Sequence, residues 1–112
     1  MAYVHYITEI KPGLLERFCQ LLPATDEFEG KLLARYGAKL VGHWRTVVGA
    51  SDVVISLYYW EDFSRRSEVV KERARLKDTP AHVRAFKEVN ECIARTTTSL
   101  VEPIGAPPLV MV

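Results

Sequence analysis

The stretch that most constrains the fold is Gly42–Trp60, which has the composition of two β-strands joined by a short turn. β-Branched and aromatic residues crowd both halves, and small and polar residues between them favour a turn. Closing this hairpin around Ala50 and Ser51 places Gly49 opposite Asp52, and it fixes the register of every cross-strand pair. Because side chains alternate along a strand, the register divides the hairpin into two faces.

These two faces differ in character. One carries Trp44 beside Leu57, and we expect it to pack under the helices of the same chain with Trp44 buried. The other face mixes apolar and polar side chains, and we expect it to be the uncovered face of the sheet. Its members are Val41, His43, Arg45, Ser56, Tyr58 and Trp60.

Before the hairpin, the sequence predicts one strand and two helical segments. The strand is Tyr3–Ile10, whose two sides both carry apolar residues. Apolar residues at helical spacing begin at Leu14, and Pro23 should kink or stop that helix because proline lacks the N–H. A second segment should restart near Asp26 with a capping box and end at Gly37.

After the hairpin, Asp62 is a good N-cap for a helix to about Lys77, and Thr79 followed by Pro80 starts another. Arg95–Val101 reads as the last strand. The order is therefore βαββαβ, with the second helix in two pieces. Right-handed crossovers place the first and third strands in the middle of a four-stranded antiparallel sheet. This order predicts an α+β, ferredoxin-like fold.

The uncovered sheet face has consequences for assembly. Val41, Tyr58 and Trp60 together would form a large exposed apolar patch, so we expect a homodimer or a higher homo-oligomer. Two sheets facing each other would form a dimeric α/β barrel around a shared cavity. The 112 residues fit one domain over residues 1–103. An apolar tail, residues 104–112, is expected to lie on this chain or on a partner.

Composition limits the partners and the compartment. A formal net charge of +1 gives no field that would steer nucleic acid or an anionic membrane. No apolar run approaches the ~20 residues of a membrane span, and Met1 leads directly into strand-like sequence. We therefore expect no signal peptide and a cytoplasmic protein. Cys19 and Cys92 share no redox or metal spacing, and we interpret them as buried free thiols.

Spacing also argues against built metal and nucleotide sites. The three histidines and two cysteines are scattered, so we expect no metal site and no cofactor. A haem with one axial histidine needs no spacing motif and is therefore not addressed by this argument. The absence of Gly-x-Gly-x-x-Gly, P-loop and Gly-x-Ser-x-Gly patterns argues against nucleotide chemistry and serine hydrolysis.

The hairpin supplies the candidate ligand-binding residues. An imidazole at His43 could act as an acid or base near neutral pH, and Arg45 could hold a carboxylate or enolate. Tyr58 and Trp60 could sandwich a flat apolar ligand. In the competing interpretation the aromatic residues pack a dimer interface, and His43 and Arg45 hydrogen-bond across it. The full candidate set adds Ser56 beside Arg45 and His5, whose sheet face the sequence does not decide.

Several short motifs resemble the NIPSNAP family of dimeric α/β-barrel proteins over most of Tyr3–Pro103. They are Lys11-Pro12-Gly13, Gly42-x-Trp44-x-Thr46-x-x-Gly49 and Val54-x-x-Leu57-Tyr58-x-Trp60. The chain departs from the family pattern where Tyr58 and Trp60 exchange the usual aromatic residues, and where Ser56 replaces a frequent His. The resemblance implies a barrel-forming oligomer. It implies no reaction, because the family has no generally accepted catalytic residues.

Two functional hypotheses follow. The first is a small-molecule-binding protein or structural oligomer that takes an apolar or aromatic ligand in the barrel. The second, by analogy with the wider dimeric α/β-barrel group, is a cofactor-independent oxygenase or isomerase. A dry apolar pocket that opens to solvent, with His43 or His5 pointing into it, would favour the second.

Overall fold

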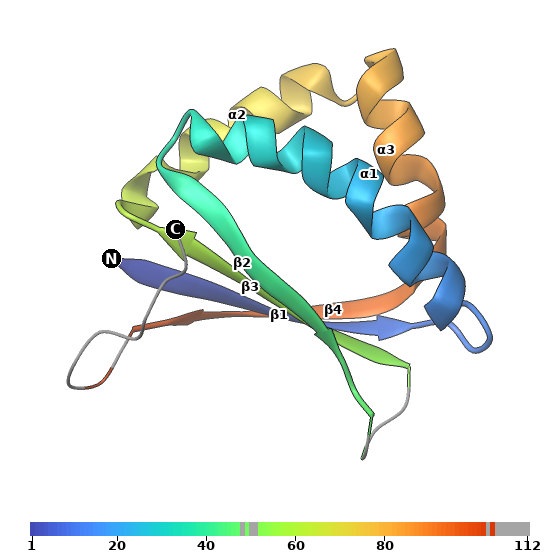
Figure 1. Ribbon diagram of the computed structural model, residues 1–112. Coiled ribbons are helices and arrows are strands. Elements are labelled where there is room, and N and C mark those ends of the chain that lie inside the picture. The colour runs from blue at the N-terminus through green and yellow to red at the C-terminus, as the bar shows by residue number, and fades with distance from the viewer. Residues whose placement is uncertain (48, 50–51, 103, 105–112) are drawn as a thin grey trace.

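The computed structural model describes residues 1–47, 49, 52–102 and 104. Within them the four strands form one antiparallel sheet in the order β2-β3-β1-β4. The helices cover one face of this sheet, and none of the helices among the described residues lies on the other face, which we term the open face (Figure 1). The elements are β1 (Ala2–Ile10), α1 (Leu15–Ala34), β2 (Ala38–Arg45), β3 (Val53–Trp60), a 3₁₀ turn η1 (Phe63–Arg65), α2 (Arg66–Leu76), α3 (Pro80–Cys92) and β4 (Ile93–Val101).

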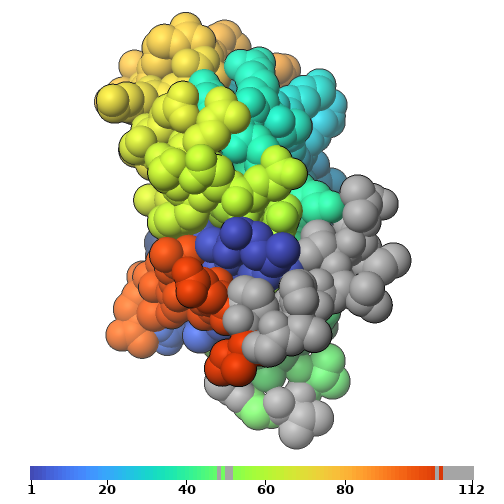
Figure 2. Space-filling view, turned by 90° about the vertical axis from the view of Figure 1, so that its left-hand side faces the viewer, coloured from blue at the N-terminus to red at the C-terminus, as the bar shows by residue number. Residues whose placement is uncertain are grey.

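This arrangement confirms the α+β, ferredoxin-like expectation, with the first and third strands in the middle of the sheet. The predicted starts after the hairpin are also confirmed. The Asp62 carboxylate accepts a hydrogen bond from the Ser64 N–H at 3.0 Å, and the Thr79 hydroxyl accepts one from the His82 N–H at 3.3 Å. Figure 2 shows the beginning of β1 beside the end of β4, where Tyr3 pairs with Val101.

The predicted break at Pro23 is wrong. α1 runs for 20 residues with Pro23 inside it. An interior proline costs about 3 kcal/mol, but the buried face of α1 continues on both sides of it, from Phe18 through Thr25 to Leu33. Packing along that whole face outweighs the local cost. Asp26 therefore lies within the helix and is not its N-cap.

The hairpin register also differs from the prediction. His43 pairs with Ser56 and Trp44 pairs with Ile55, a slip of two residues from the predicted pairs. β2 ends at Arg45, and the predicted turn residues Ala50 and Ser51 lie outside the described residues. A slip of two keeps every side chain on its face, because the side-chain period of a strand is two. A further irregularity between Leu40 and Gly42 shifts the register once more.

The assignment of the two faces is inverted relative to the prediction. Trp60 is only 4% exposed and belongs to a buried cluster with Val4, Leu33 and Val69 under the helices. Trp44 is 51% exposed on the opposite face. The expectation that Trp44 is buried, and that Tyr58 and Trp60 lie on the open face, is therefore wrong. Alternation shows which residues share a face, but the crossovers decide which face the helices cover.

Two apolar clusters hold the helices on the sheet. The first cluster contains Trp60 and lies between the sheet and helices α1 and α2. The second contains Phe18 and lies between the sheet and helices α1 and α3. Cys92 is buried in the second cluster as a free thiol, whereas Cys19 is half-buried. None of the helices among the described residues is long and apolar enough to cross a membrane. Of the predicted tail, residues 104–112, only Ile104 is described.

Candidate functional site

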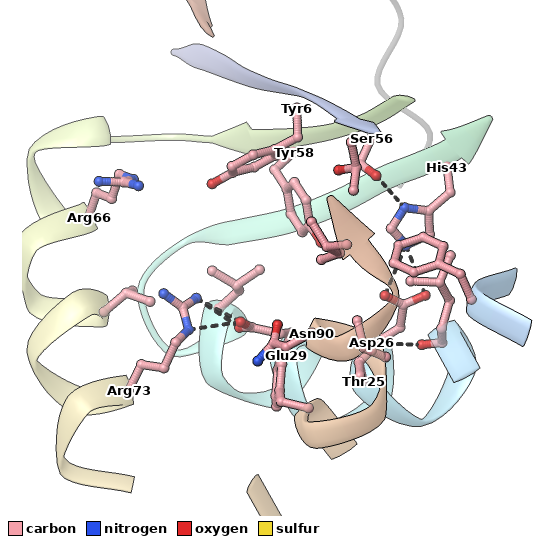
Figure 3. Close-up of a pocket in the computed structure, with 18 of the residues that line it drawn as sticks. Tyr6, Thr25, Asp26, Glu29, His43, Ser56, Tyr58, Arg66, Arg73 and Asn90 are labelled. Atoms are coloured by element: carbon pink, nitrogen blue, oxygen red, sulfur yellow. Dashed lines mark hydrogen bonds and ion pairs between the residues drawn. The ribbon is translucent and has the colours of Figure 1, made fainter. Parts of the chain in front are cut away.

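A pocket of about 270 Å³ lies between the covered face of the sheet and the three helices. Its polar side chains come from every layer around it (Figure 3). β1, β2 and β3 contribute from the sheet, and α1, α2 and α3 contribute from the helical layer opposite. The principal polar residues are Tyr6, Asp26, Glu29, His43, Ser56, Tyr58, Arg66, Arg73 and Asn90.

One end of the pocket holds a hydrogen-bonded chain of three side chains, which we term the Asp26–His43–Ser56 chain. The Ser56 Oγ lies 2.6 Å from the His43 Nδ1. The His43 Nε2 lies 2.9 Å and 3.1 Å from the two carboxylate oxygens of Asp26. His43 and Ser56 face each other across β2 and β3, and Asp26 reaches toward His43 from α1 (Figure 3).

These contacts determine how the neutral imidazole of His43 carries its proton. A carboxylate can only accept, so the Nε2 of His43 donates its hydrogen to Asp26. The Nδ1 then bears the lone pair and accepts the hydrogen of the Ser56 hydroxyl. Both ring nitrogens are thus engaged, and Asp26, His43 and Ser56 all line the pocket.

A charged pair lies at the other end of the pocket. The Arg73 guanidinium from α2 donates to both carboxylate oxygens of Glu29 from α1, at 2.8 Å and 3.0 Å. Because this geometry is bidentate and the Glu29 side chain is only 14% exposed, the pair fixes α2 against α1. Arg66, in α2, also lines the pocket. Its guanidinium carbon lies 6.0 Å from the centroid of the Phe63 ring, and it has no carboxylate partner among the described residues.

Two tyrosines stand between these ends. The Tyr6 and Tyr58 rings meet edge to face with their centroids 5.5 Å apart. Within the described part of the chain, neither hydroxyl has a hydrogen-bond partner. Burial, and then the negative charges of Asp26 and Glu29, raise the pKa of Tyr58 well above its usual value. The Tyr58 phenol therefore stays protonated at neutral pH and can donate a hydrogen bond.

The remaining walls of the pocket are apolar, and several of them are aromatic. Such walls accommodate a flat apolar molecule, and the few polar groups fix its orientation. No group of three or more His, Cys, Asp or Glu side chains that could hold a metal ion comes together in the described residues. The apolar lining consists of Phe18, Leu22, Leu33, Trp60, Val69, Phe86, Val89 and Ile93.

The structure brings four of the six candidate residues together: His43, Ser56, Tyr58 and Trp60. They meet under the helices of one chain, and not on the open face where we expected them. Arg45 is outside the pocket, where its guanidinium donates to the exposed Glu16 at 2.6 Å. That hydrogen bond raises the pKa of Arg45. His5 pairs with Leu57, on the face turned away from the helices.

Sequence reasoning missed the acidic residues of α1. Asp26 was assigned to an N-cap because Pro23 was expected to break the helix. A helical stripe continued through the proline places Asp26 and Glu29 on the same side as Leu22 and Leu33, which line the pocket. That periodicity is the signal that could have found both carboxylates.

No family model matches the sequence, and no curated protein matches it significantly. Solved structures do match. An uncharacterized NIPSNAP domain protein from Burkholderia xenovorans is 20% identical, with a TM-score of 0.71 over 96% of this chain and 99% of that one. A NIPSNAP family protein of unknown function from Agrobacterium tumefaciens is 20% identical, with a TM-score of 0.74 over 99% of this chain and 94% of that one.

A more distant match has a different description. A putative antibiotic biosynthesis monooxygenase from Nitrosomonas europaea is 9% identical, with a TM-score of 0.64 over 94% of this chain and 100% of that one. Likenesses at these identities concern the fold and not the chemistry of the site. Several matching structures that span nearly the whole chain are NIPSNAP proteins, so the resemblance of the short motifs is confirmed for the fold of one chain, and the barrel-forming oligomer stays a prediction. The chain has the fold of the solved NIPSNAP proteins.

Proposed function

We propose that the chain is a NIPSNAP family protein that binds a small aromatic or similarly flat apolar ligand between its sheet and its helices. The observation that carries this proposal is the convergence of aromatic walls on one pocket with Tyr6, Tyr58 and Arg66, whose polar groups have no hydrogen-bond or carboxylate partner among the described residues. A volume of about 270 Å³ lies just below the ~300 Å³ at the small end of ligand pockets. The ligand is therefore one or two rings in size.

Arg66 gives the ligand a preferred charge. Its guanidinium points into the space between α2 and the sheet, on the side to which the Tyr6 hydroxyl also points (Figure 3). A cation in a partly apolar pocket that has no carboxylate partner among the described residues favours an anionic oxygen on the ligand. We therefore propose that the ligand carries a carboxylate or another oxygen that bears negative charge.

The two tryptophans allow a direct test. Trp60 lines the pocket and Trp44 lies on the open face, so Trp44→Phe leaves one tryptophan as a reporter of the pocket. We expect 4-nitrobenzoate, an aromatic carboxylate whose electron-poor nitro-substituted ring quenches indole fluorescence at short range, to quench Trp60 saturably. Arg66→Gln should weaken this binding about tenfold, the effect of losing one charge-assisted hydrogen bond.

Arg75→Gln is the matched control, because Arg75 is on the same helix but pairs with Glu72 outside the pocket. It should leave the affinity unchanged. Absence of saturable quenching, or equal effects of the two substitutions, would overturn the proposed ligand site.

We also propose that two copies associate through the open face of the sheet. That face carries an apolar row formed by Ile7, Ile55 and Leu57, with Trp44 at its edge strand. A second copy offers the same row, which is what a two-fold interface requires. Sedimentation at micromolar concentration should give a dimer, and Trp44→Glu should convert it to a monomer. A wild-type monomer would contradict the proposal.

A cytoplasmic location belongs to the same proposal. Two free cysteines, one of them buried, suit a reducing compartment. Cell fractionation with a tagged full-length chain tests this location.

A second candidate function is a cofactor-independent oxygenase or isomerase acting on an aromatic substrate. The observation that favours it is the Asp26–His43–Ser56 chain at the end of the pocket, since a histidine oriented by a carboxylate suits acid–base chemistry. Assays of oxygen uptake and of double-bond migration, with electron-rich aromatic ketones as substrates, test for this activity. Activity that is unchanged in His43→Gln would exclude this use of the chain.

A further inference from the structure

We propose that the Asp26–His43–Ser56 chain is a proton relay that removes the hydroxyl proton of a phenolic or enolic ligand through Ser56. This inference rests on the proposed ligand pocket and names the class of ligand that the pocket takes. Ser56, and not the imidazole, is the residue that contacts the reacting atom.

Both nitrogens of the His43 imidazole are already hydrogen-bonded. His43 Nε2 is held by the Asp26 carboxylate at 2.9 Å, and His43 Nδ1 is held by the Ser56 Oγ at 2.6 Å. No nitrogen is left to meet a ligand directly, so the histidine can act only through the serine. Ser56 is 7% exposed and lines the pocket, which places its oxygen at the boundary between the chain and a ligand.

The proposed proton transfer balances in atoms and charge. The ligand O–H bond breaks, and its proton passes to the Ser56 Oγ while the serine's own proton passes to the His43 Nδ1. The ligand oxygen keeps the electron pair as a phenolate or enolate. The imidazolium is stabilised by the Asp26 carboxylate, and the ligand anion accepts a hydrogen bond from the Ser56 hydroxyl that has received its proton. No oxidant or reductant takes part.

The surroundings of Ser56 separate this role from nucleophilic attack on an ester or amide. Ser56 lies in β3, which pairs with β1 on one side and β2 on the other. The backbone N–H groups around Ser56 therefore serve the sheet ladders. Among the described residues, these ladders leave no backbone N–H of β3 beside Ser56 to stabilise an oxyanion, which acyl transfer requires. A ligand that carries its own acidic hydroxyl needs no such donor pair.

The test uses 4-nitrophenol, whose ionised form absorbs at longer wavelength, together with 4-nitroanisole, its methyl ether without the acidic proton. Below the ordinary pKa of the phenol, we expect the bound wild-type probe to be at least tenfold more ionised than the free probe. Ser56→Ala should still bind nitroanisole but lose this gain in ionisation, and Ser56→Thr should restore part of it. Ser99→Ala, on exposed β4, is the matched control and should behave as wild type.

The outcomes distinguish this inference from the proposed function. If neither probe binds the wild-type protein, the ligand pocket itself fails. If both probes bind and the phenol gains no ionisation, or if Ser56→Ala ionises it as well as wild type, the relay is overturned and the pocket stands. A burst of nitrophenol from 4-nitrophenyl acetate, with an acetyl group on Ser56 by mass spectrometry, would also overturn the relay and identify Ser56 as a nucleophile.

Discussion

The two faces of the sheet are similar in apolar content but opposite in use. On the covered face, His43, Ser56 and Tyr58 lie under the helices, whose carboxylates and arginines surround them. On the open face, Trp44 and Leu57 have no helix above them within the described part of the chain. The comparison shows that hydrophobicity does not mark the functional face of this sheet. What marks it is the set of charged side chains that α1 and α2 direct toward it.

The largest expected contrast between the faces comes from the tryptophans. Trp60→Ala removes a ring that is 4% exposed from the core and should cost about 3–5 kcal/mol of unfolding free energy. Urea unfolding measures the loss. A cost below about 1 kcal/mol would show that the covered face is misassigned.

A smaller contrast lies along α2, between an arginine that faces the pocket and one that faces solvent. Arg73→Ala leaves the largely buried Glu29 without its partner and should cost about 1–3 kcal/mol. Arg75→Ala removes an exposed partner of Glu72 and should cost below about 1 kcal/mol. Equal losses in the two variants would argue against the Glu29–Arg73 pair as a tie between α1 and α2.

The burial of Tyr58 on the covered face should also make the stability of the protein depend on pH in the alkaline range. Burial raises the pKa of Tyr58 above its ordinary value of about 10, so the unfolded chain loses this proton first as the pH rises. Its contribution to stability is complete below pH 10 and declines above it, by about 1.4 kcal/mol per pH unit for one proton. Tyr58→Phe should reduce the slope of unfolding free energy against pH by up to the contribution of one proton. Tyr59→Phe, on the open face, is the matched control. An unchanged slope in Tyr58→Phe would contradict a buried phenol.

The smallest effect on folding is expected from the open face. Trp44→Ala removes a half-exposed ring and should cost below about 1 kcal/mol of monomer stability. Measuring unfolding at low protein concentration separates this loss from any effect on association. A loss comparable to that of Trp60→Ala would mean that Trp44 is covered within its own chain.

Much of the fold was predictable because it depends on local patterns. Strand alternation grouped His43, Ser56 and Tyr58 on one face, and this grouping survived an error of two residues in the register. The covered face was not predictable from the hairpin, because both faces are apolar and the crossovers choose between them. Proline propensity misplaced Asp26, because packing along α1 outweighs one missing hydrogen bond. The sequence did not single out Arg66 as a site residue, since several arginines of α2 occupy similar local patterns.

Locating a bound ligand tests the central claim, that the ligand site lies under the helices of a single chain, most directly. Crystals soaked with 4-bromophenol would reveal the bromine by its anomalous scattering. The account predicts a bromine peak in the pocket bounded by Ser56, Tyr58 and Trp60, with the phenolic oxygen toward the Ser56 Oγ. A peak on the open face beside Trp44, or between the sheets of two copies, with none under the helices, would contradict it.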